Sequence, residues 1–123
     1  MSQQEIYLGN PNLKRANVAQ NFTPEEVEEF VKCSKDPVYF ITNYIKIISL
    51  DLGLVPFELY PFQADMVNKF HDNRFNIAKL PRQSGKSTVV TAYLLWYSIF
   101  NDNVNVAILA NKAATAREML QRL

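Results

Sequence analysis

KLPRQSGKSTVV, residues 79–90, is the stretch on which the interpretation of the whole sequence depends. Its Gly-Lys-Ser triplet at 85–87 matches the last three positions of the phosphate-binding loop G-x-x-x-x-G-K-[ST]. The glycine that opens this motif is missing, because Leu80 stands in its place. Leu80 and Pro81 have fewer accessible backbone conformations than glycine, so we expect a loop whose entry differs from the common form.

The chemistry of the triplet suits a nucleoside triphosphate. Such a ligand needs converging backbone N–H groups, a lysine near the β- and γ-phosphates, and a hydroxyl on Mg²⁺. Gly85, Lys86 and Ser87 supply these in order. Arg82 precedes Gly85 by three residues and would stabilise charge on the transferring phosphoryl group from within the same chain. The alternatives are a helix that happens to begin with Gly-Lys-Ser and a surface arginine without a ligand.

A second pattern lies about twenty residues before the loop, where Tyr60, Pro61, Phe62 and Gln63 begin a predicted helix. A glutamine amide can both donate to and accept from the edge of adenine while an aromatic ring stacks on its face. This pattern predicts that the preferred nucleotide carries adenine. The alternative is an ordinary helix start with a polar residue.

Two helix starts precede these motifs. Thr23 is a predicted N-cap, with Pro24 at the first helical position and Glu26 completing a capping box. Asp36 and Pro37 repeat the arrangement for a second helix. The lone Cys33 and the lone His71 are predicted to be ordinary helix-face residues, because neither a disulfide nor a metal cluster can be assembled from them.

The remaining segments alternate between strand and helix patterns. We expect, in order, a short strand in IKIISL with a loop after it, a helix from Pro61, a strand at 75–80, a buried helix at 88–100, a strand at 104–110 and a last helix from Lys112. Strands that alternate with helices predict an α/β fold with a parallel sheet covered on both faces.

Composition and charge restrict the function classes. The chain is 48% hydrophobic and 20% charged, as in a folded domain. Its first half, residues 1–59, carries five basic and eight acidic residues, whereas 60–123 carries eight basic and four acidic ones, which suits phosphate ligands. No signal-peptide layout is present, and the apolar run at 88–100 is shorter than a membrane span needs, so we expect a soluble protein without a membrane partner.

Taken together, the segments from LYPFQADMVNKF through KLPRQSGKSTVV to AILANKAATAREMLQRL resemble the start of the ATPase domain of tailed-bacteriophage large terminase subunits of the T-even-like myovirus type. The similarity extends back to CSKDPVYFITNYIKI and covers about residues 33–123. It implies the fold of a P-loop NTPase, a parallel sheet with flanking helices, present here as an incomplete first part at 60–123. A helical lead-in segment at 23–59 and a flexible arm at 1–22 would precede it.

The resemblance also implies a function for individual residues. Tyr60 and Gln63 would hold adenine, and Ser87 would bind Mg²⁺. Arg82, as an arginine finger acting in cis, and Lys86 would be the catalytic residues. The phosphates of ATP would be held by the loop residues Arg82, Gln83, Ser84, Gly85, Lys86, Ser87 and Thr88.

Other features of the family are missing. After Lys86 the only acids are Asp102 and Glu118, so we find neither the carboxylate that activates water nor a nuclease site. We therefore expect little turnover by this chain alone, as a fragment, a truncated product or one piece of a split terminase. The family implies double-stranded DNA, a portal protein and a small terminase subunit as partners, in the cytoplasm of an infected bacterial host. A helicase-like ATPase and a chain that binds ATP or partners without hydrolysis remain as alternatives.

Overall fold

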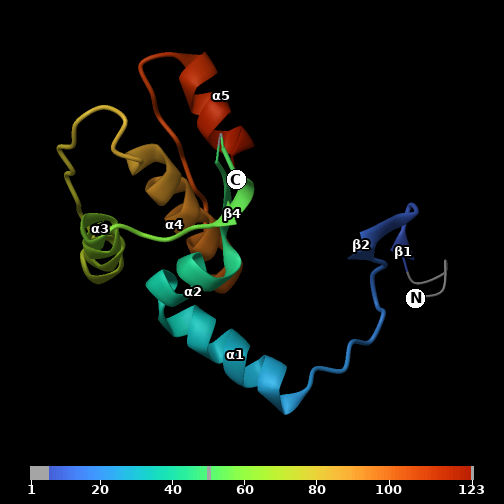
Figure 1. Ribbon diagram of the computed structural model, residues 1–123. Coiled ribbons are helices and arrows are strands. Elements are labelled where there is room, and N and C mark those ends of the chain that lie inside the picture. Colours follow the sequence, from blue (N-terminus) through green and yellow to red (C-terminus); the bar gives the residue numbers. More distant parts are fainter. Residues whose placement is uncertain (1–5, 50, 123) are drawn as a thin grey trace.

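The computed structural model describes residues 6–49 and 51–122. In chain order its elements are β1 (Ile6–Tyr7), β2 (Asn10–Lys14), α1 (Pro24–Lys35), α2 (Pro37–Tyr44), β3 (Lys46–Ser49), β4 (Gly53–Pro56), α3 (Pro61–Asp72), α4 (Lys86–Phe100) and α5 (Ala113–Gln121). Figure 1 shows a helical body with α4 near its centre, while the β1–β2 hairpin stands apart at the end of an extended segment. In the described part of the chain, no helix has the length and apolar character that crossing a membrane requires.

The prediction of a parallel sheet, and with it the P-loop NTPase fold, is wrong. Among the described residues there are two sheets, and each is an antiparallel pair, β1 with β2 and β3 with β4. The segments at 75–80 and 104–110, which were expected to be strands, run outside any helix or strand. The fold is therefore mainly helical, with two hairpins.

The reason for this error lies in what a strand pattern specifies. An apolar, β-branched segment indicates which side chains favour burial, but a strand forms only where a second strand supplies hydrogen bonds along its length. Ile77 and Leu109, one from each segment, are 101% and 88% exposed. Neither segment therefore has the covering neighbours that a central strand requires.

The predicted helix starts at Thr23 and Asp36 are confirmed. Thr23 Oγ1 accepts a 3.2 Å hydrogen bond from the N–H of Glu26, while Glu26 Oε2 accepts one of 2.8 Å from the N–H of Thr23. Asp36 Oδ1 accepts a hydrogen bond from the N–H of Tyr39 at the start of α2. In each of these helices, a side chain at the helix start therefore accepts a hydrogen bond from an N–H group that has no partner within the helix.

The core lies where α2, α3 and α4 meet. Its buried members are Ile41 from α2, Phe57 before α3, Met66 and Val67 from α3, and Val89 and Ala92 from α4. The indole N–H of Trp96 in α4 donates a 2.8 Å hydrogen bond to the carbonyl of Cys33, which ties α4 to the end of α1. The segment predicted as a buried helix is buried or half-buried from Lys86 to Trp96, but its last turn is exposed, with Ile99 49% exposed.

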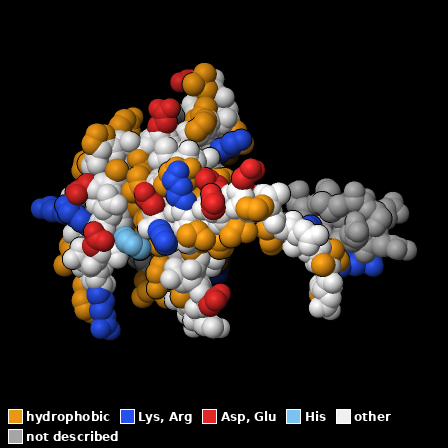
Figure 2. All heavy atoms as spheres, turned by 90° about the horizontal axis from the view of Figure 1, so that it is seen from below, with side chains coloured by type: hydrophobic (Ala, Val, Ile, Leu, Met, Phe, Trp, Pro, Cys, Tyr) orange, Lys and Arg blue, Asp and Glu red, His pale blue; other side chains and the backbone are white. Residues whose placement is uncertain are grey.

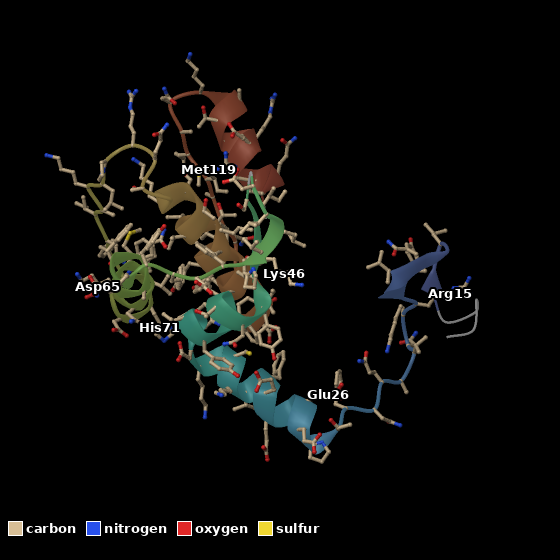
Figure 3. All side chains as sticks on the ribbon, viewed as in Figure 1. Arg15, Glu26, Lys46, Asp65, His71 and Met119 are labelled. Carbon is tan, nitrogen blue, oxygen red and sulfur yellow. The ribbon has the colours of Figure 1, made fainter. Side chains whose placement is uncertain are left out.

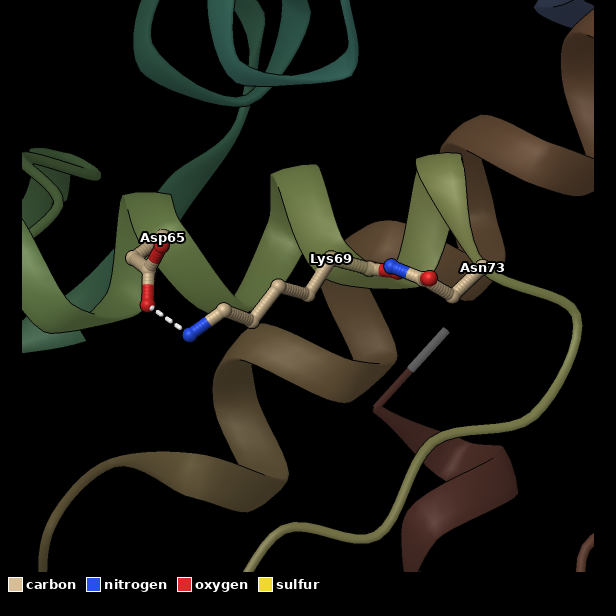
Figure 4. A network of polar contacts seen from close by, with 3 residues as sticks. All are labelled: Asp65, Lys69 and Asn73. Atoms are coloured by element: carbon tan, nitrogen blue, oxygen red, sulfur yellow. Dashed lines mark hydrogen bonds and ion pairs between the residues drawn. The ribbon is translucent and has the colours of Figure 1, made fainter.

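The outer face of α3 is polar. Figure 4 shows Asp65, Lys69 and Asn73 following one another along this helix, and Lys69 Nζ lies 2.6 Å from Asp65 Oδ2. The side-chain amide of Asn73 donates to the carbonyl of Lys69 in the last turn. Both charged side chains are more than half exposed, so the pair adds little stability while it keeps this face in water.

Residues 1–22 were predicted to form a flexible arm. Residues 1–5 lie outside the described part of the chain, and residues 6–14 contain the β1–β2 hairpin. Leu8 and Gly9 form its turn with φ angles of 49° and 77°. Glycine takes this conformation freely, whereas leucine rarely does, which explains why the sequence did not indicate the hairpin.

Candidate nucleotide site

The first turn of α4 begins at a glycine in the left-handed conformation. Gly85 is the N-cap residue with φ 74° and ψ 11°, and it has no side chain to close the helix end. The carbonyl of Gly85 accepts the helical hydrogen bond of Val89. By helix geometry, the N–H groups at 86–88 come before this bond and have no partner within the helix. They form a set of aligned donors of the kind that binds phosphate.

The turn before Gly85 holds the loop in a compact form. Ser84 Oγ donates a 3.0 Å hydrogen bond to the carbonyl of Pro81, and Gln83 has φ 60°. A methyl group at Gly85 would lie 2.7 Å from Gln63 Nε2, so a larger residue would strain the backbone and collide with α3. The position therefore requires glycine for two separate reasons.

Gln63 connects the start of α3 to this loop. Its side chain is only 3% exposed. Gln63 Oε1 accepts a 2.9 Å hydrogen bond from the N–H of Tyr60, and Nε2 lies 3.4 Å from the carbonyl oxygen of Ser84. The amide that was predicted to recognise adenine is thus already bonded to the start of its own helix and to the loop, with one Nε2 hydrogen left.

A cleft of about 600 Å³ joins the two motifs. Tyr60 lies at this cleft with 66% of its surface exposed, and its ring stacks on Phe62 at 6.1 Å between centroids. Six of the predicted site residues line the cleft, namely Tyr60, Gln63, Gln83, Ser84, Gly85 and Thr88. The structure therefore brings an exposed aromatic ring and a glycine loop to one cavity.

The other predicted residues lie beside the cleft. The Nζ atom of half-buried Lys86 is 3.4 Å from the carbonyl oxygen of Leu80, at the entry of the loop. Arg82 is exposed at the turn, and no hydrogen bond or ion pair within the described residues involves it. Ser87 is half-buried, and its carbonyl accepts from Thr91 Oγ1. Both cations and the Ser87 hydroxyl would have to turn inward to meet a ligand.

These donors fit a phosphate chain better than they fit a bare metal ion. Helical N–H groups and the ammonium of Lys86 are suited to anionic oxygens. Within residues 6–49 and 51–122, no group of three or more His, Cys, Asp or Glu side chains could hold a metal ion. Mg²⁺ would therefore be held by phosphate oxygens and the Ser87 hydroxyl.

Sequence reasoning missed several residues at the cleft. Phe57 and Glu58, before α3, line it together with Ile47 from β3. Their positions depend on β4 lying next to α2 and on Ile47 packing against the core, which no local pattern specifies. The contact between Gln63 and Ser84 joins residues that are 21 positions apart in the sequence, so no local pattern predicted it. Gln63 was chosen as an adenine ligand and the loop as a phosphate ligand, without a contact between them.

No sequence profile of a known protein family matches the chain. The resemblance to large terminase subunits over about residues 33–123 stays a prediction from the sequence.

Proposed function

We propose that the chain binds ATP with Mg²⁺ through residues 82–88, as the nucleotide-binding part of a large terminase subunit. Such a subunit packages double-stranded DNA into a procapsid by ATP hydrolysis, with a portal protein and a small terminase subunit as partners, in the cytoplasm of an infected bacterial host. The supporting observation is the uncapped start of α4 at Gly85, which faces a cleft with an exposed tyrosine. The proposal does not require a parallel sheet, because one helix end and one turn supply the donors.

Each residue has a distinct function in this proposal. The phosphates accept from the N–H groups at 86–88, and Lys86 leaves the carbonyl of Leu80 to bind the β- and γ-phosphates. Arg82 swings in from the turn to neutralise the terminal phosphate. Tyr60 stacks on adenine, and the remaining Nε2 hydrogen of Gln63 donates to the edge of the base.

Lys86→Ala is the variant that tests binding. Loss of a charged hydrogen-bond donor should weaken ATP binding by ~1.5 to 3 kcal/mol, measured by titration calorimetry with Mg²⁺. Lys112→Ala is the matched control, because Lys112 is also a lysine at a helix start, that of α5. Equal ATP affinity in the wild type and the Lys86 variant would contradict the proposal.

A second candidate function is ATP binding without turnover, and the positions of the acids after Lys86 favour it for this chain alone. Asp102 lies in the turn after α4, and Glu118 in α5 is paired with Arg122. Neither lines the cleft, so neither is placed to orient an attacking water, and the carboxylate that does line it among the described residues is Glu58, which precedes α3.

Steady-state phosphate release separates the two functions. We expect release well below ~1 per second, the lower end of ordinary enzyme rates, with and without double-stranded DNA. DNA-stimulated release above that rate, abolished by Lys86→Ala and retained by Lys112→Ala, would show that this chain completes its own catalytic site.

A further inference from the structure

A second cleft lies between α1, α2 and the end of α4. It has a volume of about 690 Å³, and its walls are aromatic. The rings pack against one another, with centroids 5.1 Å apart for Phe30 and Phe100 and 5.3 Å apart for Phe40 and Phe100. Phe30 and Tyr44 are still 58% and 52% exposed. We call this cavity the α1 cleft.

The rim of the α1 cleft is acidic. Glu25, Glu26 and Glu29 of α1 all line it. Glu26 closes the capping box and Glu29 accepts from the hydroxyls of Tyr39 and Tyr44, so these two carboxylates already serve the fold. Figure 2 looks from below onto the body and shows acidic side chains among hydrophobic ones next to the arm. An apolar floor with an acidic rim fits an apolar side chain flanked by cations.

The arm of the same chain has the opposite character. Residues 6–22 contain Lys14 and Arg15 and no acidic residue. Leu8 is 85% exposed at the tip of the β1–β2 hairpin, and Leu13 is 50% exposed. A two-stranded hairpin is at best marginally stable by itself, so these apolar side chains need a surface to cover them. In Figure 3, Arg15 on the arm lies well away from Glu26 at the start of α1.

We propose that the hairpin of one copy docks into the α1 cleft of a second copy, with Leu8 between the aromatic rings and Lys14 against Glu25. Arm and cleft are complementary in charge and in apolar surface, and both occur on every chain. Residues 16–23 join the hairpin to α1, and the ribbon shows the hairpin standing apart from the helical body (Figure 1). Such a contact joins two different surfaces, so two chains that exchange arms form a closed dimer, and chains that do not exchange arms form a head-to-tail series. It does not depend on the nucleotide site.

Analytical ultracentrifugation of the whole chain tests the contact. We expect concentration-dependent association that weakens as salt rises, since the rim contacts are electrostatic. Leu8→Ser should weaken association roughly tenfold or more, because a buried leucine is lost. Leu52→Ser is the control, since Leu52 is 78% exposed at the turn of the other hairpin and should have no effect.

Mixing variants shows whether the contact joins two copies. Lys14→Glu alters only the arm and Glu25→Lys only the cleft, and each should weaken self-association roughly two- to fivefold. An equimolar mixture contains an unaltered arm and an unaltered cleft on different chains, so it should regain the affinity of the wild-type contact. Circular dichroism verifies that both variants keep their helices.

Three results would overturn the proposal. They are a wild-type chain that stays monomeric at low salt at every concentration, association that Leu8→Ser leaves unchanged, and a mixture that associates no better than its components. The first result is the one that a hairpin folded back onto its own chain would give.

Discussion

The first N–H groups of a helix have no partner within the helix, and α1 and α4 differ in how these groups are satisfied. At α1, Thr23 and Glu26 satisfy each other's N–H groups, and Glu25 and Glu26 place negative charge in the first turn. At α4, Gly85 provides no capping side chain, the first turn has no acid, and Lys86 adds a positive charge. One helix start is completed by its own residues, while the other leaves its donors and its dipole to a ligand.

The difference teaches that a helix start can be built for stability or for binding, but not fully for both. A capping side chain stabilises a helix by about 1 kcal/mol and occupies the donors that an anion would use. Gly85 makes no such hydrogen bond and leaves the donors open at a cost of only about a few tenths of a kcal/mol, and the Gln63 side chain contacts the loop beside it. The stability of the α4 start therefore depends on α3, whereas the start of α1 depends on its own sequence.

Gly85→Ala should break the α4 start and give the largest effect. A left-handed alanine costs about 1 to 2 kcal/mol, and displacing the Gln63 amide from Ser84 should add ~1 kcal/mol. Gly53→Ala is the matched control, because Gly53 has φ 70° but nothing within 4 Å of an added Cβ. Urea unfolding measures both variants, and equal losses would show that Gln63 does not constrain the loop.

Thr23→Ala should break the α1 start at a smaller cost. Loss of the capping hydroxyl should lower the free energy of unfolding by about 1 kcal/mol without changing the affinity for ATP. Thr42→Ala, at an exposed position within α2, removes a threonine that caps nothing and should be neutral or slightly stabilising. A drop in ATP affinity with Thr23→Ala would mean that the two helix starts are coupled.

The smallest expected effect is a pH dependence of the free energy of unfolding that comes from Glu29 in α1. Hydrogen bonds from Tyr39 and then Tyr44 hold the pKa of Glu29 below its usual 4.5. A lowered pKa in the folded state means that this contribution is present above pH 4.5 and is lost as the pH falls through the folded value. In urea unfolding between pH 6 and 3, the free energy of unfolding should fall less with decreasing pH in Glu29→Gln than in the wild type, and it should fall as in the wild type in Glu28→Gln. An unchanged pH dependence in Glu29→Gln would mean that the hydrogen bonds from Tyr39 and Tyr44 to Glu29 do not contribute to stability.

Local patterns predicted the helices well. Each helix start was indicated by a cap and the proline after it, Thr23 for α1 and Asp36 for α2. These residues lie within four positions of the first helical turn that they determine, and the structure has both helices there. The start of α4 was predicted close to its observed position for the same reason, since Gly85 and Lys86 mark it in the sequence. Signals of this kind need no distant partner.

Non-local arrangement was not predictable in the same way. The segments 75–80 and 104–110 have the composition of strands, but the structure gives them no partner among its described residues. At the site, the sequence indicated Tyr60 and the loop, whereas the bond from Gln63 to Ser84 required the packing of α3 against α4. Composition specifies what a segment can bury, and the fold decides whether anything covers it.

The contact between Trp96 and Cys33 gives this chain an optical reporter. Trp96 is the only tryptophan, is 3% exposed, and lies 5.6 Å from the ring of Tyr93. Its emission maximum should therefore be blue-shifted, and it should move to longer wavelength when α1 separates from α4 and water reaches the indole. Because the nucleotide cleft is lined by other residues, the same signal can distinguish loosening of the α1 side from changes at the loop.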